Sequence, residues 1–549
     1  MVTLIGLTAS PAHADEIVVE GTDTVIGLYR DELTEKIERA IVKGAVYLKN
    51  NQARDGSWSP PDEWGGAVKT RYAEFDFRAG STAVILMGLL YCGTNVDNPT
   101  IERGLRYLAK HERRSISTYT RSAMLGAFAM SDPHGRSRDH SRMVERQAKW
   151  LLMTQQKNKH NLWRYSNHPG QLGLYDLSCT QFALEALRIA DNYGQQMPPK
   201  MFLEMQKALW KLQNNDGSWA YSTDAASKGN KNHTAPRLSM TAATTAGLAF
   251  LDAYLTRAGK PTGRRDPHID SGLSATRRMY KATVDPYEAY SIERAGILTG
   301  TRYLGDHDWY REIATKLIAR QAEDGHWPSY PHHNDRAHCL GTGFTLLFLG
   351  KGLAPTVVGR LDWGVPGRAT PWDMRNLTEA VSREIGSHLN WYSLPVGAKE
   401  DEYLKFPLIY IAGAEDPYDK LIRHKAKFVR YLNAGGTILG VGVENNEAFE
   451  KGFKKFVGEI QPGAAFEELD TKHPIYNSWH DIRRSYGLYA TKSDKGGRPM
   501  ALYIDKPFAV PLDTRRGRGA KQAMELGTNI IVALTQIDKR KSLLEDAMK

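Results

Sequence analysis

Cysteine is scarce in this chain: only Cys92, Cys179 and Cys339 occur among its 549 residues. Each lies in an apolar stretch with helical spacing, a setting that is typical of buried free thiols. An odd count also argues against a disulfide framework. We therefore expect three free cysteines and a core without covalent cross-links.

Long hydrophobic runs and nucleic-acid-binding motifs are also missing. No stretch offers the roughly 20 uninterrupted apolar residues that a membrane-spanning helix needs, so we expect a soluble mature protein with no transmembrane segment. The net charge is +11, but the basic residues are dispersed. Their densest cluster (Arg515, Arg516, Arg518 and Lys521) lies among glycines and is typical of a solvated loop, so we expect no nucleic-acid partner.

The first residues have the pattern of an export signal. Val2 to Ala9 is a short apolar run, and Ala12-His13-Ala14 fits the small-x-small cleavage pattern. We interpret residues 1–14 as a signal peptide; the usual basic segment is missing, which either a truncated or a misassigned start would explain. The alternative is an ordinary apolar tail. The expected location is the periplasm or the cell envelope.

One phrase recurs along the chain: Gln, two residues, then Asp-Gly-x-Trp. Each copy follows an apolar stretch with helical spacing and precedes another, which indicates a repeat of helix, turn and helix. Asp and Gly favour a tight reversal, Trp can lock neighbouring repeats together, and the Gln amide can bond helix ends, so we expect these residues to be structural. The copies are Gln52, Asp55, Gly56 and Trp58; Gln213, Asp216, Gly217 and Trp219; Gln321, Asp324, Gly325 and Trp327; and a degraded copy from Gln155 to Trp163.

A second pattern places apolar residues four and seven positions after a Thr. Thr82, Thr180 and Thr342 follow it with leucines, and Thr241 follows it more loosely. These helices are rich in small residues and apolar on more than one face, which predicts burial on all sides. Inner apolar helices that alternate with outer amphipathic ones predict an α/α toroid over residues 15–355.

The pattern changes after residue 355. Glycines and prolines break the periodicity over 356–371, which we interpret as a linker. Short buried strands are expected at 406–413, 437–443 and 529–534, with an amphipathic helix over 418–433. Strand, helix and strand at this spacing predict a smaller α/β domain with a mostly parallel sheet over 372–540.

The repeat phrase resembles the QW motif of squalene/hopene and oxidosqualene cyclases, and related toroids occur in protein prenyltransferases. The resemblance covers about residues 30–355 and implies a toroid of the terpenoid-cyclase type. Those cyclases protonate an alkene with an Asp in the motif Asp-x-Asp-Asp-Thr. The matching segment here is Asp176-Leu177-Ser178-Cys179-Thr180, so serine stands at the proton-donating position and Asp176 is the one remaining candidate acid. This departure argues against cation cyclisation.

The C-terminal part resembles an uncharacterised bacterial family with a class I glutamine-amidotransferase-like fold, which occurs in secreted proteins beside such toroids. The similar segments include 408–413, 431–437, 473–476 and 527–530. An amidotransferase needs a nucleophilic Cys after a strand. Here Glu444-Asn445-Asn446-Glu447 follows the second strand and no cysteine occurs beyond 339, so a binding role is favoured, with His473 and His480 structural.

Zinc chemistry of the prenyltransferase type would need Asp, Cys and His ligands that converge. Asp335, His338 and Cys339 are candidates because positions 335 and 339 share a face if helical. The alternative is a loop histidine beside a buried cysteine. We predict no cofactor and leave zinc open.

A polar residue precedes each recurring Thr by four positions. These residues are Arg78, Asp176, Arg237 and His338. At this spacing each shares a face with its Thr, near the inner helices' N-termini. They are candidates for binding a carboxylate or phosphate at one end of the cavity; the alternative is that they are solvated helix starts.

Three functions remain open on the sequence. The first is an exported toroid that binds a hydrophobic or anionic small molecule or an envelope protein, without cyclase chemistry. The second is a diverged terpenoid cyclase or transferase, or a polysaccharide-acting enzyme. The third is a structural component of a cell-envelope assembly. An aromatic cavity would favour a lipid, paired carboxylates in a cleft would favour sugar chemistry, and a filled centre with an exposed apolar patch would favour assembly.

Overall fold

A computed structural model gives the fold of most of the chain. The described residues are 31–58, 71–158, 160–166, 174–223, 229, 231–259, 264–328, 338–364, 370–443, 447–483, 486–491, 499–517, 519–537, 543–545 and 547–548. The expected signal peptide, Asp335 and residues 444–446 lie outside them.

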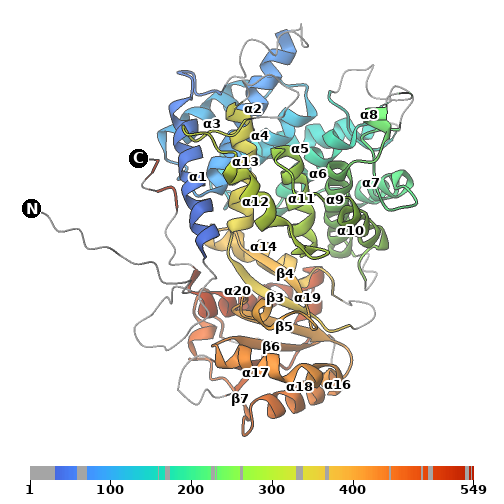
Figure 1. The fold of residues 1–549 in the computed structure, drawn as a ribbon, viewed down its shortest axis with the longest axis vertical. Helices are drawn as coiled ribbons and strands as arrows, with labels where there is room; N and C mark the ends of the chain where they lie inside the picture. Colours follow the sequence, from blue (N-terminus) through green and yellow to red (C-terminus); the bar gives the residue numbers. More distant parts are fainter. Residues whose placement is uncertain are drawn as a thin grey trace, which may run out of the picture.

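Six inner helices form a closed ring. Each packs against the next, and the last packs against the first (Figure 1). Their small side chains allow close approach on all sides, so that 18 of the 20 residues of α9 are buried. The inner helices are α2 (Arg71–Tyr91), α4 (Thr118–Ser131), α6 (Leu177–Asn192), α9 (Leu238–Arg257), α11 (Pro286–Thr299) and α13 (His338–Leu353).

Six outer helices surround this ring and alternate with the inner ones along the chain. They are amphipathic: α3 buries Ile101, Leu105 and Leu108 at helical spacing. They are α1 (Glu32–Asn50), α3 (Pro99–His111), α5 (Arg138–Lys157), α7 (Pro199–Leu212), α10 (Pro267–Met279) and α12 (Trp309–Ala319). Short α8 (Lys231–Thr234), β1 (Tyr303–Leu304) and β2 (His307–Asp308) lie in connections. The N-terminal part is therefore an α/α toroid, as the sequence predicted.

Each Trp of the repeated phrase joins a turn to the next inner helix. Its backbone N–H donates to the hydroxyl of the recurring Thr, and its indole N–H donates to a carbonyl near the end of the preceding outer helix, 2.7–3.0 Å away. The Trp and Thr patterns are thus two halves of one joint. The pairs are Trp58–Thr82 at 3.0 Å, Trp163–Thr180 at 3.3 Å, Trp219–Thr241 at 3.1 Å and Trp327–Thr342 at 3.0 Å.

Each Gln joins its turn to the next outer helix. Its amide donates to the turn's own Gly carbonyl and to one carbonyl of the following outer helix. The second bond runs from Gln52 to Thr100 at 2.9 Å, from Gln213 to His268 at 3.0 Å and from Gln321 to Ala40 at 2.8 Å. Because Ala40 lies in α1, the third copy closes the outer layer.

At the turn glycine of the full copies, a side chain would collide with the next outer helix. Gly217 has φ +85°, and a Cβ there would lie 2.4 Å from the Ser271 carbonyl oxygen of the next outer helix. In the degraded copy, Asn161 takes the equivalent position with φ 56°. Asn is one of the few residues that tolerate this left-handed conformation.

A seven-stranded sheet forms the C-terminal part, in the order β4-β3-β5-β6-β9-β8-β7. The first five strands of that order are parallel to one another. β8 pairs antiparallel with β9, and β7 pairs antiparallel with β8. The strands are β3 (Thr356–Asp362), β4 (Asn390–Pro395), β5 (Leu408–Gly413), β6 (Thr437–Gly442), β7 (Phe466–Glu468), β8 (Leu488–Thr491) and β9 (Ala501–Ile504).

Helices cover both faces of this sheet, each with its own apolar core. On one face lie α14 (Asp373–Ile385), α19 (Ala509–Thr514) and α20 (Ala520–Thr535). On the other lie α15 (Glu400–Tyr403), α16 (Tyr418–Leu421), α17 (Lys425–Asn433) and α18 (Glu447–Ile460). The predicted α/β domain is therefore present.

Three local expectations differ from the structure. The predicted strand at 529–534 lies within α20, because a short apolar run alone does not distinguish a strand from a buried helix. The predicted linker at 356–371 begins with β3, which pairs with two neighbours in the sheet. The predicted helix at 418–433 is broken by a 3-10 turn at Ile422–His424. In the part of the chain that is described, no helix is long and apolar enough to cross a membrane.

Candidate functional site at the open end of the toroid

The two ends of the toroid differ. At the C-terminal ends of the inner helices, the α/β domain is docked, with α14 between toroid and sheet (Figure 1). There Asn390 donates to the Lys351 carbonyl at 2.9 Å, and the Ser393 N–H donates to the Gly300 carbonyl at 2.8 Å. These bonds satisfy carbonyls that a helix end leaves unpaired. The N-terminal ends of the inner helices form the other end, where no second domain docks among the described residues; we call it the open end.

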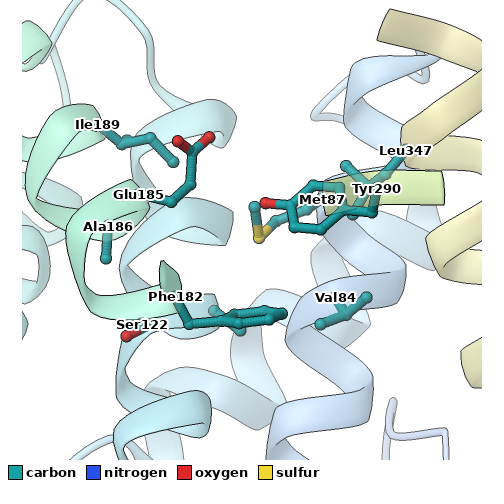
Figure 2. Close-up of a pocket in the computed structure, with 10 residues that line it drawn as sticks. Val84, Met87, Ser122, Phe182, Glu185, Ala186, Ile189, Tyr290 and Leu347 are labelled. Carbon is teal, nitrogen blue, oxygen red and sulfur yellow. The ribbon is translucent and has the colours of Figure 1, made fainter. Parts of the chain in front are cut away.

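The centre of the ring is filled. Figure 2 shows side chains that converge there, among them Val84, Met87, Phe182, Glu185, Tyr290 and Leu347. The space they leave for a water-sized molecule is about 10 Å³. A cavity needs about 10–15 Å³ by this measure to hold one water. The cavity between these side chains therefore has no room for an organic substrate.

Buried charges surround this centre. Glu185 pairs with Arg188 at 2.9 Å, Arg294 at 3.3 Å and Lys351 at 3.7 Å. Burial alone would raise the pKa of Glu185, but these three cations hold it well below its usual value. Lys351 also lies 3.6 Å from Glu293, whose pKa burial raises to about 7. The pair of carboxylates is thus sealed and compensated by cations.

The same network continues into the α/β domain. Glu379 of α14 lies 2.9 Å from Arg188 of α6 and 3.4 Å from Arg375. Burial opposes the ionisation of Glu379, but Arg375, Arg188 and Arg515 outweigh it and lower its pKa to about 2. This network is a docking contact between the two parts.

Trp372 bridges the two parts a second time. Its backbone N–H donates to Asp513 of the α/β domain at 2.6 Å, and its indole N–H donates to Asp252 of α9 at 3.0 Å. Burial raises the pKa of Asp513 to about 8 and that of Asp252 to about 6. Both carboxyls therefore favour the protonated form more than exposed ones do.

Aromatic side chains gather at the open end. Phe182 of α6 stacks with Tyr287 at 6.3 Å between ring centroids and meets Tyr119 at 4.7 Å and Phe344 at 6.2 Å. Tyr165 lies 5.9 Å from Tyr119 and is 43% exposed. These rings come from α4, α6, α11, α13 and the segment before α6, and form the aromatic cluster of the open end.

Asp176 lies beside the aromatic cluster and is fully buried. It caps α6: Oδ1 accepts from the Ser178 N–H at 2.8 Å and from the Ser178 hydroxyl. Oδ2 is buried and has no hydrogen-bond partner among the described residues. Burial raises the pKa of Asp176, and burial, with a smaller contribution from the charge of Asp176, raises the pKa values of Tyr119, Tyr165 and Tyr287. Because buried polar atoms are normally paired, a water, an ion, a ligand or a residue outside the described ranges can complete this oxygen.

The four polar residues that precede the recurring Thr lie at this end, each beside its own repeat. Asp176 and Arg237 are the N-caps of α6 and α9, and His338 begins α13. Arg237 lies over the Tyr221 ring at 5.7 Å. The Arg78 carbonyl accepts from Thr82 at 2.8 Å. The spacing of four directs these residues toward the turn that their Thr binds; that they bind an anion together stays a prediction.

Of the three residues predicted as metal ligands, the structure places His338 and Cys339 next to each other. His338 and Cys339 begin α13, and Asp335 lies outside the described residues. Burial raises the pKa of Cys339 to about 11, so it is a neutral thiol. Among the described residues, no group of three or more His, Cys, Asp or Glu side chains could hold a metal ion. The ring of His326, which the sequence reasoning passed over, lies 4.0 Å from that of His338.

The sequence reasoning also missed the buried charges and the aromatic cluster. Glu185 is an acidic residue inside the apolar run Phe182-Ala183-Leu184-Glu185-Ala186-Leu187, and that was a usable signal. In the α/β domain, His480 pairs with Glu384 at 2.8 Å. The chain has no cysteine after 339 to serve as a nucleophile there.

Comparison with known proteins adds one family match. Residues 362–533 match the family described as Domain of unknown function (DUF4159). No curated protein matches the chain in sequence. The match covers the sheet from the end of β3 to α20 and leaves the toroid outside it.

Solved structures with similar folds cover the toroid. The type II terpene cyclase MstE from Scytonema is 11% identical, with a TM-score of 0.37 over 58% of this chain and 98% of that one. The GH76A alpha-1,6-mannanase from Salegentibacter sp. HEL1_6 is 9% identical, with a TM-score of 0.40 over 59% of this chain and 99% of that one. The toroid assignment itself rests on the closed ring of helices.

Proposed function

We propose that the chain is an exported binding protein that holds a small ligand at the open end of its toroid and does no chemistry there. The ligand is an apolar molecule that carries one polar group, such as an isoprenoid alcohol. The observation that carries this proposal is Asp176: a buried carboxyl whose Oδ2 is unpartnered among the described residues, beside Tyr119, Tyr165 and Tyr287.

The filled centre supports binding over sugar chemistry. Glycoside hydrolysis needs two carboxyl groups that flank a substrate. Glu185 and Glu293 are a buried pair, but both lie beside Lys351, and the cavity that Glu185 lines has only about 10 Å³. A sugar has no access to them in this arrangement.

The acidity of Asp176 supports binding over terpenoid cyclisation. Protonating an alkene needs an unusually strong acid in a preorganised site. Burial instead raises the pKa of Asp176 and makes it a weaker acid than an exposed Asp. Ser178, at the position that matches the acid of the cyclases, donates its hydroxyl to Asp176. Its Oδ2 is suited to accept a hydrogen bond from a ligand when Asp176 is ionised and to donate one when it is protonated.

For the α/β domain we propose an amidotransferase-like fold without amidotransferase activity. Its supporting observations are the parallel sheet and the missing cysteine after residue 339. Its role is to brace the closed end of the toroid through α14 and Glu379.

A partner protein is the second candidate occupant of the open end. A filled centre with half-exposed Tyr119 and Tyr287 and exposed Tyr165 also suits assembly into the cell envelope. Export itself rests on residues 1–14, and sequencing the N-terminus of protein from its own host tests it: a chain that begins near Asp15 is expected, and an intact Met1 would contradict export.

The binding proposal is tested by calorimetric titration with farnesol. We expect saturable binding to the wild type that weakens at least about tenfold in Tyr165→Ala and in Asp176→Asn, which keeps the N-cap. Trp479→Ala is the matched control, because Trp479 is 41% exposed but lies in the α/β domain. Its affinity is expected to equal that of the wild type.

Two results would overturn the proposal. Affinity that is unchanged in Tyr165→Ala would place the ligand elsewhere. Conversion of farnesol to a cyclic product by the wild type, lost in Asp176→Asn, would make the site catalytic. Binding of a purified envelope protein in place of farnesol, lost in Tyr165→Ala, would select the partner candidate.

A further inference from the structure

The third copy of the repeated phrase departs from the first two at two positions. Where the first and second copies have Ser57 and Ser218, the third has His326. Four residues before the recurring Thr, the corresponding inner helices have Arg78 and Arg237, and α13 has His338. The two departures therefore place two histidines at one joint.

The serines show what this turn position does structurally. Ser57 and Ser218 donate through their hydroxyls to Asp55 and Asp216, at 2.7 and 2.6 Å. His326 meets the same need, with Nδ1 2.6 Å from Asp324 Oδ1. Because a serine is sufficient for the turn, the imidazole brings something the turn does not require: a second ring nitrogen.

Asp324 also fixes the state of that second nitrogen. A carboxylate that accepts from Nδ1–H holds the neutral ring in the tautomer whose Nε2 carries the lone pair. A carboxylate behind a histidine is the usual outer partner of metal-binding histidines. His326 is thus oriented as a ligand by its own turn.

His338 supplies a second imidazole close by. The two ring centroids lie 4.0 Å apart with the planes tilted by 43°. Tyr47 of α1 is another ring neighbour of His326, with ring centroids 5.3 Å apart. The two imidazoles are thus direct neighbours, although one belongs to the turn and the other to α13.

We propose that His326 and His338 form a binding site for one divalent transition metal ion of the zinc, copper or nickel class. Imidazole nitrogen suits these ions. The described residues supply these two ligands. Cys339, a neutral thiol, is outside this ligand set.

The site would strengthen the contact between the last repeat and α1, where the ring closes. His326 belongs to the turn after α12, His338 to α13 and Tyr47 to α1, and the same turn carries Gln321, which bonds to Ala40. An ion that binds only the folded chain stabilises it by mass action. Zinc should therefore raise the melting temperature.

The test titrates the metal-free full chain with ZnCl2 by calorimetry, at pH 7.5. His326→Ser restores the residue of the first two copies, and His338→Arg restores the residue of α2 and α9. We expect one ion per wild-type chain, at least tenfold weaker binding in each variant and loss of the zinc-dependent rise in melting temperature. His307→Gln is the control, because His307 also pairs with a carboxylate, Glu312, at 2.9 Å, but has a tyrosine as its ring neighbour.

Binding that is absent in the wild type, or equal in the wild type, His326→Ser and His338→Arg, would overturn the proposal. Circular dichroism checks that each variant folds. If His326→Ser does not fold, the zinc affinity of His338→Arg decides the outcome. The Co²⁺ absorption spectrum of the wild type is then the second measurement, because it reports nitrogen ligands directly. A Co²⁺ spectrum of the fully aquated ion would equally refute the site.

Discussion

Gln321 and Ala40 are joined by a hydrogen bond of 2.8 Å between the side-chain Nε2 and the backbone carbonyl oxygen, across 281 residues of sequence. Gln52 and Gln213 make the same bond to the next outer helix, across 48 and 55 residues. The same hydrogen bond that joins neighbouring repeats thus also joins the last copy to the first outer helix and closes the ring.

Removing this bond should destabilise the toroid. Gln321→Ala deletes two hydrogen bonds, to Ala40 and Gly325, so we expect the free energy of unfolding to fall by about 1–3 kcal/mol, measured by urea denaturation. Gln213→Ala deletes the two equivalent bonds and serves as the matched variant. A loss in Gln213→Ala with none in Gln321→Ala would contradict closure by this contact.

A methyl group at a turn glycine should cost more than the backbone strain alone. In Gly217→Ala the new Cβ would lie 2.4 Å from the Ser271 carbonyl oxygen, and φ is +85°. Gly194 has φ +93° with nothing within 4 Å, so Gly194→Ala isolates the strain. We expect about 1–2 kcal/mol for Gly194→Ala and at least about 1 kcal/mol more for Gly217→Ala. Equal losses would show that the close approach is unimportant.

The stability that Asp513 contributes to the folded chain should fall as pH rises. Burial raises the pKa of Asp513 to about 8 in the folded chain, against about 3.9 for an unfolded Asp. Because the folded value is the higher one, the stability that protonation of Asp513 contributes is complete below about pH 4 and is lost as pH rises to about 8.

Asp513→Asn isolates this effect, because Asn keeps the acceptor for the Trp372 N–H and does not titrate. The stability of the wild type relative to the variant should fall with pH over that window, by up to about 1.4 kcal/mol per pH unit. Chemical denaturation at pH 5, 6, 7 and 8 measures it. A difference that stays flat from pH 5 to pH 8 would refute the assignment.

Glu379→Ala should weaken the contact between the toroid and the α/β domain. It leaves Arg188 and Arg375 without this buried partner, and removing one member of a buried ion network costs about 3–5 kcal/mol. We expect a lower melting temperature and faster proteolysis between the toroid and β3. Exposed Glu459→Ala, which loses only a 3.4 Å surface contact with Lys425, should change stability by less than about 1 kcal/mol.

The toroid could be predicted from the sequence because its joints repeat. The spacing of Gln, Gly and Trp is fixed by bonds to Leu48, Thr82 and Thr100, and their equivalents recur in the other copies. The strand at 529–534 was wrong because Ile530 and Ile531 pack on the sheet from α20, where an apolar run fits equally well.

The candidate site could be predicted only in part. Asp176 was found through a motif, but its buried setting depends on Tyr119 and Tyr287, which lie on other helices and have no local signature. His326 was not predicted as a site residue because it occupies a variable position of the repeated phrase. Its meaning appears only when the fold places it beside His338.

The central claim, that the open end of the toroid holds an apolar ligand, is tested most directly by native mass spectrometry of protein purified from its own host. We predict a noncovalent small-molecule adduct on the wild type that organic extraction removes and that Tyr165→Ala lacks. A wild-type chain at its apo mass, or the same adduct on Tyr165→Ala, would contradict the claim.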